Sequence, residues 1–493
     1  MKWPATGALL VLTGLTGCGS QYRPVINPIH STGPASQPEA LVAVFSQPGL
    51  VPASAASTTP PCPAIDPSTG QPMAYPSPGV VTVLDATGDT VSALATLGNG
   101  PLTFALDGAG ANAYTENCDG TISSMDISGS LMTKDVATSS LLPGAAPINA
   151  LVTTGGQYVV EQGHNAVAAM GSNPPTLKVE ITDVAPSLIN LTGNSTSTRI
   201  YAISQGNSNG GNLAWGSCGS PSSVSVDGEA DGIETASNSI SSRIPLGVCP
   251  VYGVISADNN RVFILNRGSG TITVINAQTN QLDTTNASSY LNGDATINLC
   301  NGATPCNAGP VDADFYPPGN LLVVTNYDND TVSVIDTSLD VYGNDSATFG
   351  KVLATIPVGH EPAGVSVLQD GSRAYVANEG DGTVTVVSLT SFQPLTTIQL
   401  TPVQNPADPN NPNDTVLPQP RVVTSNYNYP YGNVFVGAQN SQYVTVIRTD
   451  TDVVSARILV QGEVVDLRTT KQYAGQTTAN NNVQSRSVGS GEP

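Results

Sequence analysis

An acidic run at residues 227–234 stands out among the groups that could do chemistry. It reads Asp227-Gly-Glu229-Ala-Asp231-Gly-Ile-Glu234. Carboxylates at alternate positions followed by glycine can wrap a hard cation with oxygen ligands, as calcium loops do. Glu234 comes too early for the distal ligand of a helix–loop–helix calcium site, and the flanking residues are typical of strands. Asp227, Glu229 and Asp231 are therefore candidate ligands of a structural calcium ion, and the alternative is a turn whose acids face solvent.

Residues suited to catalysis are sparse. The sequence has three histidines: His30 in a proline- and serine-rich region, His164 in a turn, and His360 in the string Gly-His-Glu-Pro at 359–362. Hydrolysis of a lactone or ester needs histidine, arginine or carboxylate groups that converge on one point. The sequence shows no such set, so no catalytic residue is predicted, and His360 is expected to have a structural role.

The start of the chain has the pattern of an export signal. A short basic start precedes an apolar run, Ala8 to Thr16, that is too short to span a bilayer as a permanent helix. The string Leu15-Thr16-Gly17-Cys18 resembles the lipobox of bacterial lipoproteins, which implies cleavage before Cys18 and lipid on its thiol and new amino group. We therefore expect a signal peptide at 1–17, a flexible tether at 18–39, and a membrane-anchored envelope protein that faces the periplasm or the exterior.

The stretch from Val352 to Leu400 contains one complete structural unit. Four segments rich in β-branched residues, GVSVLQ, RAYVAN, TVTVVS and PLTTIQL, are separated by the turn signals at 370–372, 380–382 and 391–393. These turns tolerate positive φ, so the strands should pair as an antiparallel meander. The second and third strands recur as NNRVFILNRGSGTITVINA (259–277) and GNLLVVTNYDNDTVSVIDT (319–337), and more weakly from residues 108, 155, 197 and 432. A repeat of this kind indicates a propeller or a solenoid.

These strings resemble the YVTN repeat of bacterial and archaeal cell-surface β-propellers. The match is closest at Val358 to Val365, which follows the pattern VG-x-x-P-x-G-V, and at Tyr375 to Asn378. The resemblance implies an all-β propeller of four-stranded antiparallel blades, and it implies a fold far more than a function. Propellers of this family also resemble sugar-lactone hydrolases, which leaves a lactonase-like hydrolase as the alternative function.

The second strands predict eight blades within residues 40–470. They lie at 41–45, 111–115, 157–161, 199–204, 261–266, 321–326, 373–378 and 433–438. The first unit lacks an innermost strand, and Glu463 to Arg468 is a strand without a unit at the other end of the chain. If that strand completes the first blade, the ring closes without an open sheet edge. A seven-bladed ring, with 41–45 in the tether, is the alternative, and 471–493 is expected to be a disordered polar tail.

Six of the seven cysteines remain when Cys18 is set aside, and in an exported chain an even number favours disulfides. In an up-and-down propeller, the loops between second and third strands lie on the same face as the connections between blades. All six cysteines fall in such segments, so we expect three pairs: Cys62 with Cys118, Cys218 with Cys249, and Cys300 with Cys306. Free buried thiols are the alternative, and a zinc site is disfavoured because no CxxC pair exists.

The same face carries the long insertions, at 47–79, 206–221, 286–310 and 401–419. Long loops on a rigid scaffold often bind ligands. Trp215 lies in one of them, where it could stack on a sugar or peptide or could simply hold its loop beside Cys218. Tyr427, Tyr429 and Tyr431 lie in a loop on the opposite face, so they cannot share a site with Trp215.

Charge limits the partners of the protein. There are 16 Lys and Arg against 37 Asp and Glu, a net charge of −21, which repels a phosphate backbone and excludes nucleic acid. The expected function is that of a lipid-anchored, monomeric β-propeller that binds an envelope protein or glycan without catalysis. The membrane is contacted through the lipid, and calcium is the only cofactor suggested.

Overall fold

The chain divides into two compact units, Met1–Pro38 and Glu39–Pro493, and every residue described here belongs to the second. In the computed structural model the described residues are 41–48, 78–85, 90–127, 132, 135–171, 174–208, 211–212, 227–256, 258–284, 295–300, 306–316, 320–342, 344–405, 408, 410–426 and 432–470. No helix in these ranges is long and apolar enough to span a membrane.

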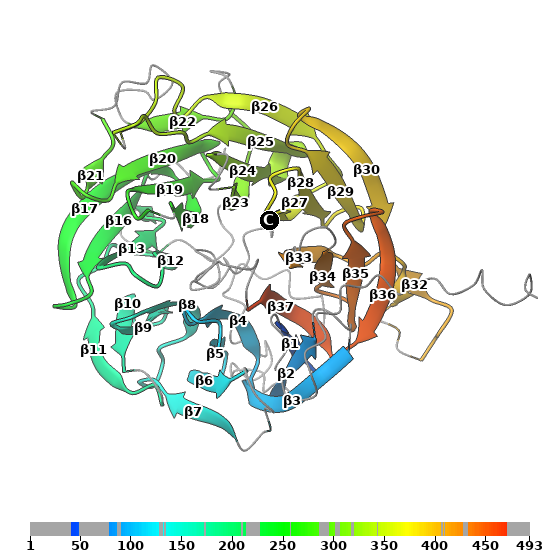
Figure 1. The fold of residues 1–493 in the computed structure, drawn as a ribbon. Coiled ribbons are helices and arrows are strands. Elements are labelled where there is room, and N and C mark those ends of the chain that lie inside the picture. Colours follow the sequence, from blue (N-terminus) through cyan, green and yellow to red (C-terminus); the bar gives the residue numbers. More distant parts are fainter. Residues whose placement is uncertain are drawn as a thin grey trace, which may run out of the picture. The chain divides into compact units, whose positions relative to one another are not determined.

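The described residues form eight antiparallel blades around a common axis, which confirms the predicted β-propeller (Figure 1). From the axis outward, blade 1 contains β37 (Glu463–Thr469), β1 (Leu41–Gln47), β2 (Pro78–Asp85) and β3 (Thr90–Asn99), and blade 2 contains β4 (Pro101–Leu106), β5 (Asn112–Asn117), β6 (Thr121–Asp126) and β7 (Val136–Ser140). Blade 3 contains β8 (Pro147–Thr153), β9 (Gly156–Glu161), β10 (Ala166–Met170) and β11 (Leu177–Ile181), and blade 4 contains β12 (Leu188–Thr192), β13 (Arg199–Ser204), β16 (Asp227–Glu234) and β17 (Ser239–Val248).

Blades 5 to 8 follow the same plan with one variation. Blade 5 contains β18 (Pro250–Ile255), β19 (Arg261–Asn266), β20 (Thr271–Asn276), β21 (Gln281–Leu282) and β22 (Thr296–Asn298), and blade 6 contains β23 (Pro310–Tyr316), β24 (Leu321–Asn326), β25 (Thr331–Asp336) and β26 (Val352–Pro357). Blade 7 contains β27 (Pro362–Val367), β28 (Arg373–Asn378), β29 (Thr383–Ser388) and β30 (Gln393–Gln399), and blade 8 contains β33 (Pro420–Asn426), β34 (Asn433–Ala438), β35 (Tyr443–Arg448) and β36 (Val453–Leu459). In blade 5 the short β21 and β22 both pair with β20 and share the outer position. The other elements are the hairpins β14 (Asn207–Ser208)–β15 (Gly211–Asn212) and β31 (Val403–Gln404)–β32 (Thr415–Val416), and the 3-10 helix η4 (Tyr327–Asn329).

Ring closure is made by the two ends of the domain. Strand β37 pairs antiparallel with β1, with Val44 opposite Leu467, and a bulge between Phe45 and Ser46 shifts the register. The backbone N–H of Thr470 donates to the carbonyl of Leu41 at 2.8 Å. The prediction that the C-terminal strand completes the first blade is therefore confirmed, and the seven-bladed alternative is wrong because β1 is a blade strand.

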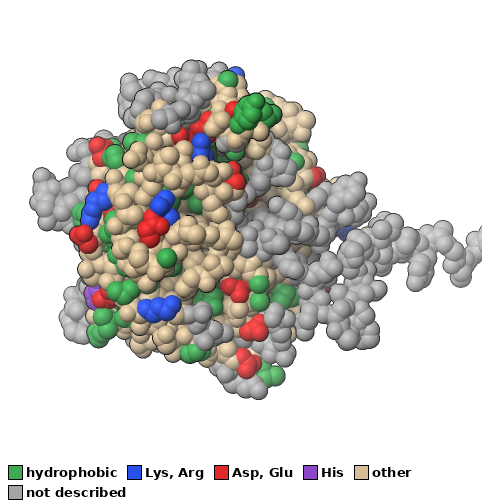
Figure 2. Space-filling view, turned by 60° about the vertical axis from the view of Figure 1, so that its left-hand side comes forward, with side chains coloured by type: hydrophobic (Ala, Val, Ile, Leu, Met, Phe, Trp, Pro, Cys, Tyr) green, Lys and Arg blue, Asp and Glu red, His purple; other side chains and the backbone are tan. Residues whose placement is uncertain are grey.

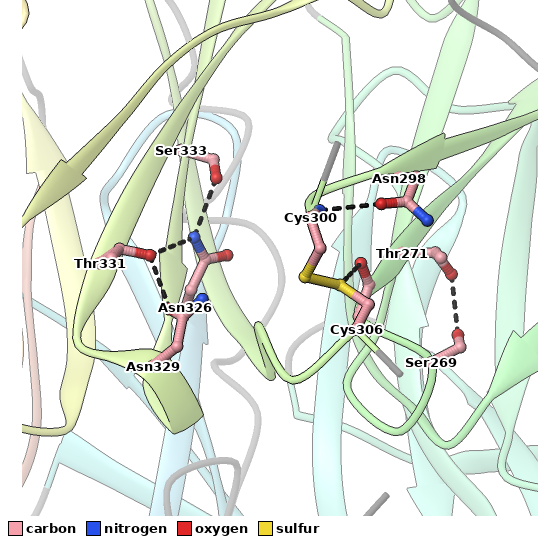
Figure 3. Close-up of a disulfide and its surroundings, with 10 residues drawn as sticks. Ser269, Thr271, Asn298, Cys300, Cys306, Asn326, Asn329, Thr331 and Ser333 are labelled. Atoms are coloured by element: carbon pink, nitrogen blue, oxygen red, sulfur yellow. Dashed lines mark hydrogen bonds between the residues drawn. A yellow bond between two sulfur atoms is a disulfide. The ribbon is translucent and has the colours of Figure 1, made fainter. Parts of the chain in front are cut away.

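A buried asparagine explains much of the repeat. In blade 7 Asn378, the last residue of β28, donates from Nδ2 to the hydroxyls of Thr383 and Thr385 on β29, at 2.9 and 2.8 Å. Asn117, Asn266 and Asn326 make the equivalent pair of bonds in blades 2, 5 and 6. Figure 3 shows Asn326 with its partners Thr331 and Ser333.

The glycine of the repeat packs against this asparagine. A Cβ added to Gly359, in the segment that leads into blade 7, would lie 2.5 Å from Nδ2 of Asn378. Gly98 stands in the same relation to Asn117, with 2.5 Å between the added Cβ and Nδ2. Only glycine lets the incoming segment approach the amide so closely, so the two residues form one unit that joins neighbouring blades.

Neighbouring inner strands are also tied by side chains. Asp312 and Asp314 on β23 accept the backbone N–H groups of Val365 and Val367 on β27, at 3.0 and 2.8 Å. Asn149 on β8 accepts the N–H of Leu191 on β12 at 3.0 Å. Hydrophobic clusters fill the space between sheets, so the second strand of a blade is buried on both faces.

One predicted disulfide is confirmed. Cys300 and Cys306 are bonded, and Sγ of Cys306 lies 3.2 Å from the carbonyl oxygen of Gly270 in the β19–β20 turn (Figure 3). Cys118 and Cys249 are also disulfide-bonded. Cys62 and Cys218 lie outside the described residues, so those two pairings stay predictions.

Candidate functional site

The acidic run at 227–234 is a strand and not a loop. Residues Asp227–Glu234 form β16, the third strand of blade 4. Nη1 of Arg243 lies 3.3 Å from Glu229 and 3.8 Å from Asp231, and the N–H of Ala185 donates to Asp231 at 2.6 Å. Burial raises the pKa of Asp231 to about 7. The expectation of a turn is wrong, because these residues form an extended strand in which Arg243 faces Glu229 and Asp231. Calcium binding by Asp227, Glu229 and Asp231 stays a prediction.

Several predicted residues cannot be placed. Cys18, Cys62, Trp215, Cys218 and the three tyrosines at 427, 429 and 431 lie outside the described residues. His360 lies at the start of blade 7, where Nδ1 is 3.0 Å from Oδ1 of Asp330 and Nε2 is 3.6 Å from Oε1 of Glu361. The hydrogen bond with Asp330 raises the pKa of His360. All three side chains are exposed, so this group is a surface ion pair.

A set of charged residues converges where the inner strands begin. This inner cluster consists of Arg267, Tyr327, Asp328, Glu379 and Arg421. Arg267 donates to Asp328 at 2.8 Å and lies 5.0 Å from the centre of the Tyr327 ring, and Arg421 donates to Glu379 at 2.8 Å. Tyr327 packs on inner strands β23 and β27. Burial, followed by the charge of Glu379, raises the pKa of Tyr327.

Sequence reasoning missed the inner cluster because its residues come from four blades. Each arginine is held against a carboxylate, which fixes the position of both groups. The expectation that no arginine and carboxylate set converges is therefore corrected. The turns between the second and third strands of neighbouring blades lie side by side only in the closed ring. The spacing of residues along the sequence does not show that they are neighbours.

A second cluster lies in blade 3, where the repeat changes. Glu161, the last residue of β9, occupies the place of Asn378, and Ala166 and Ala168 occupy the places of Thr383 and Thr385. Ala166 pairs with Glu161, and Ala168 pairs with Glu180 on β11. Alternate residues and their cross-strand partners share one face of a sheet, so both glutamates project from the face that the hydroxyls occupy in blade 7.

His164 completes this group from the β9–β10 turn. Its Nδ1 atom lies 2.9 Å from Oε1 of Glu180 and 3.6 Å from Oε2 of Glu161, and its Nε2 atom lies 3.1 Å from the carbonyl oxygen of Pro143. One donor atom from each of the three residues lies within 4.8 Å of the other two, so the group could hold a metal ion. We call Glu161, His164 and Glu180 the blade 3 triad.

Burial differs across the triad. The side chain of Glu161 is 0% exposed, that of Glu180 is 19% exposed and that of His164 is 27% exposed. Neither carboxylate oxygen of Glu161 has a hydrogen-bond partner among the described residues. Burial, and then the Glu180 carboxylate, raise the pKa of Glu161 to about 8. The hydrogen bond to Glu180 raises the pKa of His164, and the neighbouring Glu161 lowers that of Glu180.

The change of the repeat at Glu161 is visible in the sequence, although the contacts of the triad are not. When the string GGQYVVEQGHNAVAAMG (155–171) is aligned with SRAYVANEGDGTVTVVS (372–388), the asparagine and both threonines are replaced together. A lone glutamate in a strand carries little information, but the joint loss of a donor and both of its acceptors indicates that the position has a different role.

Comparison with known proteins supports the fold and no more. The chain is similar to the solved structure of apo AztD from Citrobacter koseri, with a TM-score of 0.53 and 14% identity over 87% of this chain and 97% of that one. It is also similar to Saccharomyces cerevisiae Sqt1, with a TM-score of 0.51 and 12% identity over 74% of this chain and 87% of that one. No family model and no curated protein matches the sequence. At these identities the likeness shows a shared β-propeller fold.

Proposed function

We propose that the protein is a lipid-anchored, monomeric binding module of the bacterial cell envelope that recognises a protein or glycan partner without catalysis. The anchor is Cys18, and residues 18–39 link it to the propeller. The observation that supports the binding role is the placement of the four longest insertions, at 47–79, 206–221, 286–310 and 401–419, because the strands around them place all four on the same face of the ring.

The topology of the blades fixes that face. In a four-stranded antiparallel blade, the turn from the second to the third strand lies at the same edge as the connection to the next blade. The segments between β1 and β2 and between β13 and β16 are of the first kind, and those before β23 and β33 are of the second. We call this side the loop face, and both the inner cluster and His164 belong to it.

The surface is suited to a polar partner without strong charge. Only 11% of the residues are charged. On the face drawn in Figure 2, acidic and basic side chains are scattered among mostly uncharged groups. The net charge of −21 argues against nucleic acid, and hydroxyl and amide groups are suited to bind glycans or peptide backbones.

The inner cluster favours a second candidate, a lactonase-like hydrolase, because it brings arginine and carboxylate groups together on the loop face. A screen of lactones and phosphate esters with the purified full-length protein separates the two functions. Turnover that is lost in Glu379→Gln would favour the hydrolase. The binding function predicts no turnover in either protein.

Binding of envelope glycans on an array, and crosslinking to envelope proteins in cells, test the proposed function directly. We expect saturable binding that weakens when residues 405–414, between β31 and β32 on the loop face, are replaced by glycine and serine. The matched control changes Val341 and Tyr342 to serine, because both are strongly exposed in the β25–β26 loop on the opposite face. Equal loss in both variants, or no saturable partner at all, would contradict a binding role for the loop face.

A further inference from the structure

The blade 3 triad has the properties of a metal centre. We propose that Glu161, His164 and Glu180 bind one divalent transition-metal ion of the zinc class, through Nδ1 of His164 and one oxygen of each carboxylate. The site is independent of the partner-binding function proposed above, because its evidence comes from three side chains of a single blade.

The first argument is that blade 3 has a possible metal ligand, Glu161, in the place where other blades have a structural asparagine. Four other blades use an asparagine and two hydroxyls at this place, and every one of those asparagines donates to both hydroxyls. Blade 3 keeps the strands but replaces all three groups. Ala166 and Ala168, the cross-strand partners of Glu161 and Glu180, have short apolar side chains, so β10 offers no side-chain hydrogen-bond partner to either carboxylate.

The second step is the state of Glu161. Its carboxylate is fully buried, and both of its oxygens lack a hydrogen-bond partner among the described residues. A buried carboxylate without hydrogen bonds is unfavourable unless it is neutralised or coordinates an ion. The nearest cationic group is His164, 3.6 Å away. A metal ion between them would satisfy the carboxylate directly.

The third step is the orientation of His164. Nε2 lies 3.1 Å from the carbonyl oxygen of Pro143 and donates its hydrogen there, which leaves Nδ1 directed at the two carboxylates. Metal-binding histidines commonly donate their second N–H to a backbone carbonyl in this way. The adjacent Gly144 has φ 89°, and a Cβ added there would lie 3.5 Å from Nε2. The hydrogen bond to Pro143 therefore holds the ring in the orientation required for ligation.

The donor set identifies the class of ion. One imidazole nitrogen with two carboxylate oxygens is suited to zinc and neighbouring transition metals, whereas calcium takes six to eight oxygen ligands. Three protein ligands leave one position of a tetrahedral ion for water or an external ligand. The partial exposure of His164 and Glu180, 27% and 19%, gives that position access to solvent on the loop face.

Equilibrium dialysis of the metal-stripped full-length protein against Zn²⁺, with Co²⁺ as a spectroscopic probe, tests the site. We expect one ion per chain and ligand-field bands of a four- or five-coordinate Co²⁺ with nitrogen and oxygen ligands. Glu161→Gln and His164→Gln should each weaken binding at least about tenfold. The matched control is His360→Gln, because His360 also contacts two carboxylates but lacks a buried one. It should bind Zn²⁺ as the natural protein does.

Thermal unfolding tests the site in a second way, because the effect of Glu161→Gln on stability should depend on whether Zn²⁺ is present. Without metal, Glu161→Gln should unfold at the same or a higher temperature, because it removes a buried ionisable group. With Zn²⁺, the natural protein should gain stability and Glu161→Gln should not. Absence of saturable Zn²⁺ binding, unchanged affinity in Glu161→Gln and His164→Gln, or an equal loss in His360→Gln would each overturn the metal site. A metal-free Glu161→Gln protein that is unfolded would also overturn it, since Glu161 would then be a structural residue.

Discussion

Phe45 in the first strand of the propeller lies opposite Asp466 in the last, so one sheet holds both ends of the domain. The strand β37 that carries Asp466 also buries Val464 and Leu467 between blades 1 and 8. Asp466 accepts a hydrogen bond from Thr103 of blade 2 at 2.8 Å. The last described strand is therefore in contact with three blades.

Removal of the chain from Gly462 onward should destabilise the whole domain, whereas removal from Tyr473 onward should have little effect. The longer deletion exposes the inner edge of β1 and removes two fully buried apolar side chains, each of which contributes about 1.5–3 kcal/mol. Thermal unfolding of the two truncated proteins checks the difference. Equal melting temperatures would contradict closure through β37.

Asn378→Ala should lower the free energy of unfolding by about 1–3 kcal/mol. Asn378 is fully buried, and its loss leaves the hydroxyls of Thr383 and Thr385 without their shared donor. Denaturant unfolding measures the change, and Asn413→Ala is the control because Asn413 is exposed. A change in Asn378→Ala no larger than in the control would show that the repeated asparagine does not stabilise the blade.

The fold could be predicted from the sequence because the repeat makes each blade a separate test of the same pattern. The four strands predicted within 352–400 appear as β27 to β30, and the strand at 463–468 is the inner strand of blade 1. Alternation of β-branched residues and turn signals is local, so it survives in a single sequence. Ring closure then follows because a sheet edge in solution is unfavourable.

The candidate sites could not be predicted in the same way, because they depend on contacts between residues far apart in the chain. His164 appears in the sequence as a turn residue, and its contact with Glu180 across two strands becomes visible only when the register of β10 and β11 is known. For the acidic run at 227–234, the sequence suggested a loop and the structure shows a strand. Its composition is typical of a calcium loop, but pairing with β13 and β17 makes it a strand.

The cysteines give a further prediction. Thiol labelling of the denatured, unreduced protein should find no free cysteine in the mature domain. The double variant Cys300→Ser, Cys306→Ser should lose about 2 kcal/mol of stability, because the bond closes a short loop. Mass spectrometry counts the labelled sites, and denaturant unfolding gives the stability. Labelling of two or more cysteines would contradict the predicted pairings of Cys62 and Cys218.

Cys18→Ser should move the protein from the membrane fraction to the soluble fraction. The lipobox-like string that ends at Cys18 predicts a lipid on the cysteine thiol, and serine has no thiol to carry it. Fractionation followed by immunoblotting measures the distribution. A variant that stays in the membrane would show that another segment or a partner holds the protein there.

Glu463→Gln should stabilise the protein, and the gain should grow as the pH rises. Burial of Glu463 at the start of β37 raises its pKa from 4.5 to about 7. Between these values the folded state holds a proton that the unfolded state has released, so the stability of the natural protein falls as the pH rises through this range. Glutamine does not titrate, so the variant does not lose stability as the pH rises through this range. Melting temperatures of the two proteins from pH 4 to pH 8 should therefore be similar at the acid end and diverge toward pH 8. A difference that is constant with pH would mean that Glu463 does not titrate in this range, and a gain that is largest at pH 4 would reverse the sign of the shift.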